Sequence, residues 1–140
     1  MSNEAVTVEL RGNQGDVVDF TVDDGTGISA GSIMHLLDPR TAVKSSATLN
    51  TEYFAGIAAT DKEAGDGSTN LGCYTNGIFN CRVDGSSAVS AGQLLAISGS
   101  NILALASDDT IENHGKIVGK AMEDVASSTA ETIEVAIGMR

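Results

Sequence analysis

The stretch Ile28-Ser29-Ala30-Gly31 returns almost unchanged, 61 residues later, as Val89-Ser90-Ala91-Gly92. Further matches follow in the same order: residues 54–58 with 117–121, Asp61 with Asp124, and residues 71–75 with 132–136. The offset stays between 61 and 63 residues across these anchors. Ser, Ala and Gly are abundant, so chance is the alternative, but agreement in both order and spacing favours a degenerate internal duplication.

The composition predicts an all-β fold. The chain has 140 residues, 16 Gly and one Pro, with short β-branched runs between the glycines and no convincing helical periodicity. This length suits one domain. We expect residues 1–22 to be an N-terminal arm or first strands. Residues 23–140 are expected to form a single β-barrel domain with pseudo-repeats at about 28–83 and 89–138.

Local turn signals place several strand connections. Asn76-Gly77, between residues 71–75 and 78–83, predicts a hairpin because both residues tolerate the positive φ of a type I′ turn. Residues 98–101 predict a second hairpin. Gly31 and Gly92 each stand where the chain turns into a strand, and we expect positive φ at both.

The N-terminal segment alternates apolar and polar residues at Val6, Val8 and Leu10. This alternation is typical of a strand, and the polar flanks equally suit an arm that orders only beside a partner. Both interpretations stay open on the sequence alone.

The charge disfavours two classes of partner. Nineteen acidic and eight basic residues give a net charge of −11, which repels phosphate backbones and anionic membranes. No run approaches the ~20 apolar residues of a spanning helix, and the N-terminus lacks the pattern of a secretory signal. We therefore expect neither nucleic-acid nor membrane binding, and synthesis in the cytoplasm.

Chemical motifs are sparse. Neither His35 nor His114 has a Cys or His neighbour at the spacing that zinc sites require. No nucleophile elbow or phosphate loop occurs. The acidic groups around Asp23-Asp24 and around Asp61, Glu63 and Asp66 suggest calcium, but they lack the EF-hand pattern and are typical of solvated loops. The prediction is a non-enzyme without metal or cofactor.

The two cysteines, Cys73 and Cys81, flank the Asn76-Gly77 turn. They are either two buried small hydrophobic residues or a possible cross-strand disulfide, depending on the length of the loop. Neither has a neighbouring His, so a catalytic thiolate is not expected.

Five segments in order resemble the capsid decoration, or head cement, proteins of tailed viruses. They are Phe54-Ala-Gly-Ile-Ala-Ala-Thr-Asp-Lys-Glu-Ala-Gly, Gly77-Ile-Phe-Asn-Cys, Val89-Ser-Ala-Gly-Gln-Leu-Leu, Ile117-Val-Gly-Lys-Ala-Met-Glu-Asp and Glu131-Thr-Ile-Glu-Val-Ala-Ile-Gly. The resemblance covers about residues 28–138. Its motifs are structural, and it carries over no catalytic residue.

The resemblance implies a small β-barrel or β-tulip with an extended N-terminal arm. It further implies a homotrimer on the outer surface of the mature capsid, bridging neighbouring major capsid subunits. Val6, Val8 and Leu10 would then contact the capsid by adding to a neighbour's sheet. The alternatives are a carbohydrate- or protein-binding module of a tail or fibre, and, more remotely, a nucleotide hydrolase.

Overall fold

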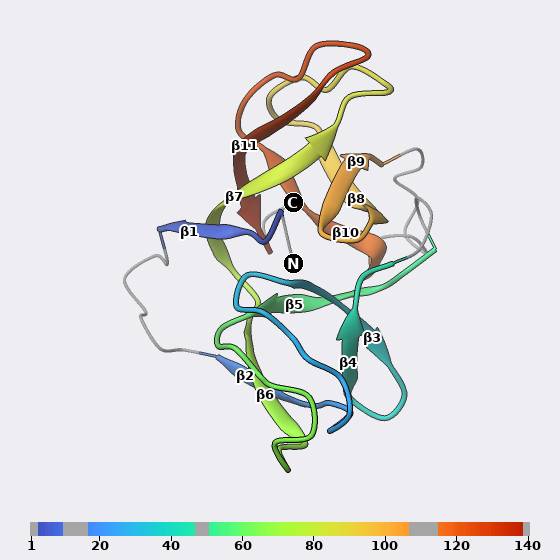
Figure 1. Cartoon of the computed structure of the whole chain (residues 1–140). Helices are drawn as coiled ribbons and strands as arrows, with labels where there is room; N and C mark the ends of the chain where they lie inside the picture. The colour runs from blue at the N-terminus through green and yellow to red at the C-terminus, as the bar shows by residue number, and fades with distance from the viewer. Residues whose placement is uncertain (1–2, 10–16, 47–50, 107–114, 139–140) are drawn as a thin grey trace.

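The computed structural model describes residues 3–9, 17–46, 51–106 and 115–138. These residues form strands and turns without an α-helix, which confirms the all-β prediction. Figure 1 shows two bodies stacked end to end, one made by the first half of the chain and one by the second. The strands are β1 (Val6–Glu9), β2 (Val18–Thr21), β3 (Ile33–Leu37), β4 (Thr41–Lys44), β5 (Phe54–Ala58), β6 (Asn70–Tyr74), β7 (Gly77–Asp84), β8 (Leu94–Gly99), β9 (Ile102–Leu105), β10 (Ile117–Ala121) and β11 (Ala130–Ile137).

Each half of the chain closes into its own five-stranded barrel. The first barrel has the order β2-β4-β3-β5-β6, and β6 pairs back to β2. In the second, β9 pairs with both β8 and β7, which closes the ladder β7-β11-β10-β8-β9. The small-barrel prediction is confirmed, but the residues expected to build one barrel build two.

The two barrels have the same pairing register, which confirms the duplication. The parallel pair Thr21↔Thr41 becomes Arg82↔Ile102, with both residues 61 positions further on. The β3–β5 and β8–β10 ladders even share an irregularity at the same place. One expected match shifts: Phe20 pairs with Leu71 and its counterpart Cys81 pairs with Ile133, so Leu71 corresponds to Ile133 and not to Thr132.

The two copies of the Ser-Ala-Gly motif make the same contacts. Gly31 donates its N–H to the Ala58 carbonyl at 2.8 Å, and Gly92 donates to Ala121 at 2.7 Å. Their φ angles are 91° and 97°, as predicted, a region that L residues rarely adopt. The conserved acids add the same cap, because Asp61 accepts from the Ala30 N–H and Asp124 from the Ala91 N–H, both at 2.7 Å. The repeated motif therefore makes the same backbone contacts just before β3 in the first barrel and just before β8 in the second.

The interiors of the barrels match position by position. The first core contains nine buried residues, and each has a counterpart in the larger cluster of the second barrel. Phe20, Met34 and Leu71, for example, correspond to Cys81, Leu95 and Ile133. In both cores most of the buried residues are aliphatic side chains that occupy every second position of a strand. A chain with 4% aromatics can therefore build two cores.

The hairpin predicted around Asn76-Gly77 is wrong. β6 pairs with β2 and β5, whereas β7 pairs with β1, β11 and β9. The turn residues instead carry the chain from the first barrel into the second, so the second repeat begins with β7 and not near residue 89. The hairpin across residues 98–101 is formed as expected, and another hairpin joins β3 to β4 across residues 38–40.

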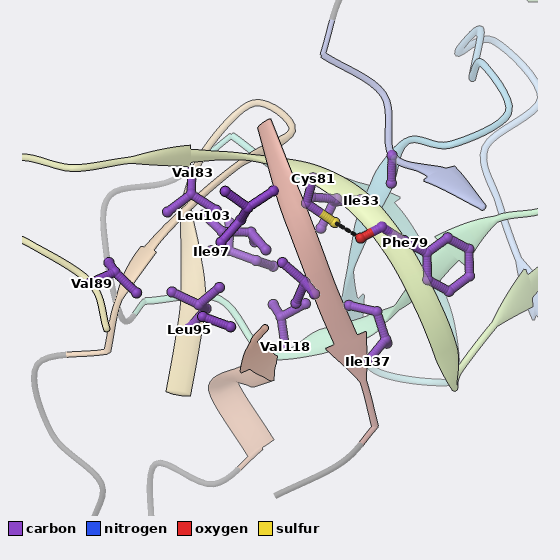
Figure 2. Packing of buried hydrophobic residues seen from close by; sticks show 14 of the residues in the cluster. Ile33, Phe79, Cys81, Val83, Val89, Leu95, Ile97, Leu103, Val118 and Ile137 are labelled. Atoms are coloured by element: carbon purple, nitrogen blue, oxygen red, sulfur yellow. Dashed lines mark hydrogen bonds between the residues drawn. The ribbon is translucent and has the colours of Figure 1, made fainter. Parts of the chain in front are cut away.

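The barrels share an apolar interface. Ile33 and Ile57 of the first barrel belong to the cluster that includes Phe79, Ile97 and Ile137 of the second. Figure 2 shows Ile33 packed in that cluster with Phe79 and Ile97. Buried Asn101, in the β8–β9 turn, accepts from the Ile33 N–H at 2.8 Å, and its own N–H donates to Ser45 Oγ at 3.0 Å. The β8–β9 turn of the second barrel thus contacts the first barrel through these two hydrogen bonds.

Candidate functional site

β1 carries the residues predicted to contact a partner. Val6 and Val8 are 59% and 44% exposed, so both valines of the alternating segment face solvent. Leu10 lies outside the described residues. β1 pairs with β7 on one side and has no second strand neighbour among the described residues. An apolar strand with an open edge is a suitable template for another chain.

β1 is anchored at its start. Ala5 is buried, and its N–H donates to the Gly31 carbonyl of the first barrel at 2.6 Å. A side chain at Gly31 would collide with the Ala5 carbonyl, so the glycine also makes room for this crossing. The rest of β1 pairs with β7 at three positions, with an irregularity between Thr7 and Glu9. The segment therefore spans both barrels (Figure 1).

The cysteines are buried and free, so the possible disulfide between Cys73 and Cys81 is not formed. Cys73 packs in the core of the first barrel and Cys81 in the core of the second. Because the predicted hairpin does not exist, no cross-strand pairing brings them together. Burial raises the pKa of both thiols to about 12, with the charge of Asp19 also acting on Cys73. They act as small core residues.

The acidic loops are organised around an ammonium group. Buried Lys62 donates from Nζ to the carbonyl of Asp24 at 2.8 Å, to that of Glu63 at 3.2 Å, and to that of Thr26 at 3.4 Å. Its Nζ also lies 3.3 Å from an Asp66 carboxylate oxygen. The backbone N–H of Ser68, assisted by Lys62, holds the pKa of Asp66 below its usual value, although desolvation opposes the shift. Among the acidic groups that suggested calcium, Lys62 therefore pairs with the carboxylates of Asp24 and Asp66.

His35, the histidine that the structure describes, pairs with a carboxylate. His35 Nε2 lies 3.0 Å from Glu52 Oε2, and the other Glu52 oxygen accepts from the Ser46 N–H at 3.1 Å. His114 lies outside the described residues. Within the part of the chain that the structure describes, no three His, Cys, Asp or Glu side chains group as metal ligands. His35 and Glu52 tie β3 to the segment before β5.

A second exposed surface was not anticipated from the sequence. An open apolar pocket on the first barrel is lined by Phe20, Leu36, Leu37, Asp38, Arg40 and Tyr53. Leu36, Leu37 and Tyr53 are 39%, 48% and 47% exposed. Leu36 and Leu37 end β3, and the sequence carries no signal that their side chains are uncovered.

The structure thus offers two apolar contact surfaces on a pair of barrels. A family model described as phage cement protein matches residues 12–137. The chain belongs to the phage cement protein family. Membership of that family gives it a structural role at the phage capsid and a place in the virion, and confirms the resemblance found in the sequence. No curated protein matches the chain.

Among the residues with described structure, no helix is long and apolar enough to cross a bilayer.

Proposed function

We propose that the protein binds the outer surface of the mature capsid as a homotrimer, without enzymatic activity, and stabilises the capsid by bridging neighbouring major capsid subunits. The observation that carries the contact is β1, whose exposed Val6 and Val8 stand on a strand with an open edge. Leu10 would extend this contact.

β1 suits binding by strand addition. Backbone N–H and C=O groups at its open edge supply affinity, and alternate valines supply specificity through apolar pockets on the partner. The anchor at Ala5 fixes one end of the strand on Gly31. The capsid subunit therefore meets a partly ordered strand, which lowers the entropic cost of association.

Stabilisation would follow from selective binding. A protein that binds the mature lattice and not the immature one shifts the equilibrium toward the mature lattice by mass action. Many copies on one particle make modest single-site affinities sufficient.

The charge of −11 suits the outer surface. Like-charged particles repel each other, and salt weakens that repulsion because exposed charges are screened over about 8 Å at physiological ionic strength. The same charge opposes binding to the packaged nucleic acid.

The first experiment is a copy-number measurement on purified particles by quantitative mass spectrometry. A copy number close to that of the major capsid protein is expected. A handful of copies would indicate a tail or fibre component, and absence from particles would refute the proposal.

The second experiment tests β1. Particles are stripped of the protein and incubated with wild type, with Val6→Glu/Val8→Glu, or with Thr132→Glu, which adds charge on the exposed wall of the second barrel. We expect the β1 variant to lose at least tenfold in affinity and the control to bind normally. Wild-type binding by the β1 variant would show that β1 is not the capsid contact.

A further inference from the structure

The two copies of the Ser-Ala-Gly motif make the same hydrogen bond within their barrels but differ in what covers them. Gly31 is buried, whereas Gly92 is exposed. A side chain placed at Gly31 would collide with the Ala5 carbonyl and would lie 2.8 Å from Glu4 Cβ. A side chain placed at Gly92 would have no other part of the described chain within 4 Å. The first copy therefore carries a contact that the second copy lacks.

This additional contact, between Ala5 and Gly31, is the seat of the N-terminal strand. Gly31 uses both of its backbone groups there. Its N–H donates to the Ala58 carbonyl of the first barrel at 2.8 Å, and its carbonyl accepts from the Ala5 N–H at 2.6 Å. The adjoining side chains add nothing at Glu4 Oε2 and Ser32 Oγ, since both atoms are buried without a hydrogen-bond partner. The seat therefore depends on the close approach of two backbones.

β1 depends on the seat because its other contacts are few. Its ladder with β7 has three paired positions and an irregularity between Thr7 and Glu9. The side chains of residues 6–8 are exposed, whereas Ala5 is 7% exposed and belongs to the apolar cluster of the second barrel. A terminal segment with so few contacts frays unless it is tied down. Ala5 on Gly31 is where this segment is tied down.

The seat also lies where the two barrels meet. Ala5 rests on the first barrel, while residues 6–9 pair with β7 of the second (Figure 1). Two residues after Gly31, the Ile33 N–H donates to Asn101 Oδ1 of the second barrel at 2.8 Å. The start of β1 is thus held by the barrel with which β1 does not pair, and this fixes the course of the strand across both barrels.

We propose that Gly31 is a positioning residue for the capsid contact, because it seats the N-terminal strand and keeps Val6 and Val8 on an ordered β1. The inference rests on the proposed function, which assigns the contact to β1, and adds the residue on which that contact depends. A side chain at position 31 displaces Ala5 and leaves β1 without its fixed start. The same substitution at Gly92 leaves β1 untouched.

The test compares the two glycines directly. Gly31→Ala and Gly92→Ala suffer similar backbone strain, because the φ angles are 91° and 97°, but only Gly31→Ala collides with the N-terminal segment. Ala5→Pro attacks the seat from the other side, since it removes the N–H donor and leaves Gly31 intact. Hydrogen exchange of residues 4–9 reports the order of β1 in the free protein. Binding to stripped particles gives the affinity, and circular dichroism gives folding and the melting temperature.

We expect Gly31→Ala and Ala5→Pro to lose the protection of the β1 amides. Both should also lose about tenfold or more in affinity for stripped particles, because β1 must then be ordered during association. Gly92→Ala should keep both properties although its melting temperature falls. A purely structural effect of alanine at positive φ would instead lower the affinity of both glycine variants alike. If Gly31→Ala does not fold, Ala5→Pro carries the test.

Three results would overturn the inference. They are unchanged protection of β1 in a folded Gly31→Ala or Ala5→Pro protein, an equal loss of affinity in Gly92→Ala, and wild-type affinity in a variant whose β1 has lost its protection. Failure of the proposed function looks different. Wild type would then leave stripped particles unbound, while the difference in hydrogen exchange between the two glycine variants would persist.

Discussion

At the scale of single residues, the duplication exposes where the two barrels diverged. Lys62 and Val125 form equivalent bridges, with Ile28 and Val89 respectively, yet one is a buried ammonium and the other a buried hydrocarbon. In the second barrel the position completes the core. In the first it gathers the loops around Asp24 and Asp66. The same position is thus a core residue in one barrel and the centre of a polar network in the other.

Replacing Lys62 with Val, its counterpart, should therefore destabilise the protein. Three carbonyls and a carboxylate lose their donor, and we expect a loss of about 1–3 kcal/mol in the free energy of unfolding. The pKa of Asp66 should rise toward its usual value. Urea denaturation and NMR titration measure the two effects, with half-buried Lys44→Met as the charge-matched control. An unchanged midpoint would show that the loops do not depend on Lys62.

The cysteine thiols give a pH-dependent prediction. Their pKa is raised from 9.0 to about 12, because burial disfavours the thiolate. Stability from these groups is complete below pH 9 and is lost as the pH rises toward 12, since the unfolded chain ionises first. At pH 8 ionisation alone should slow their reaction with a disulfide reagent about a thousandfold relative to the urea-unfolded chain. Rapid modification of native protein by Ellman's reagent would contradict the burial of these side chains.

At the scale of elements, two glycines allow neighbouring strands to approach closely. Gly56 in β5 and Gly119 in β10 are equivalent, and both pair beside the shared irregularity in their ladders. A side chain at Gly119 would collide with the Ala136 carbonyl, and one at Gly56 would lie 2.8 Å from Cys73 Cβ. Both contacts involve the next strand of the barrel wall, which cannot move aside without opening the ladder.

Gly119→Ala should accordingly cost roughly 2–4 kcal/mol of stability, as expected for overpacking against backbone. Gly27→Ala is the control, because its new side chain would lie 3.7 Å from the nearest atoms and its φ is ordinary. Thermal unfolding of both variants measures the difference. Equal melting temperatures would mean that β10 and β11 separate more easily than the register indicates.

The elements also show what the sequence could and could not predict. The Ser-Ala-Gly motifs and the two aspartates were sufficient to find the repeat, because they make the same backbone contacts in each copy. Asn76-Gly77 predicted a wrong hairpin because a turn signal is local. β6 pairs instead with β2, which lies about 50 residues earlier in the chain. The match of Leu71 slipped by one residue because nothing within a single strand determines its register.

Prediction of the candidate surfaces was limited in the same way. Val6 and Val8 were found because a polar-flanked apolar alternation is visible in the sequence. Leu36 was missed because Ile97, its counterpart, is buried. Whether such a residue is covered depends on what packs against the end of its barrel, and that is a property of the assembled chain.

At the scale of the whole molecule, the two barrels unfold together only if the interface between them contributes enough free energy to the folded state. Each barrel has about 60 residues, a size at which a single core is marginal. Ile33 and Ile57 of the first barrel complete the cluster of the second, and Asn101 secures the contact with its hydrogen bonds. We therefore expect one unfolding transition in which both barrels unfold together.

Calorimetry tests this coupling at low concentration, where self-association does not contribute. Wild type should give equal calorimetric and van't Hoff enthalpies, the signature of a two-state transition. Asn101→Gly keeps the positive φ of 58° but removes the acceptor of the Ile33 N–H, and should split or broaden the transition. Arg40→Gly makes the equivalent change in the exposed turn and should leave it intact. Two transitions in wild type would mean that the barrels fold independently, and that the end-to-end contact holds them in place without stabilising either.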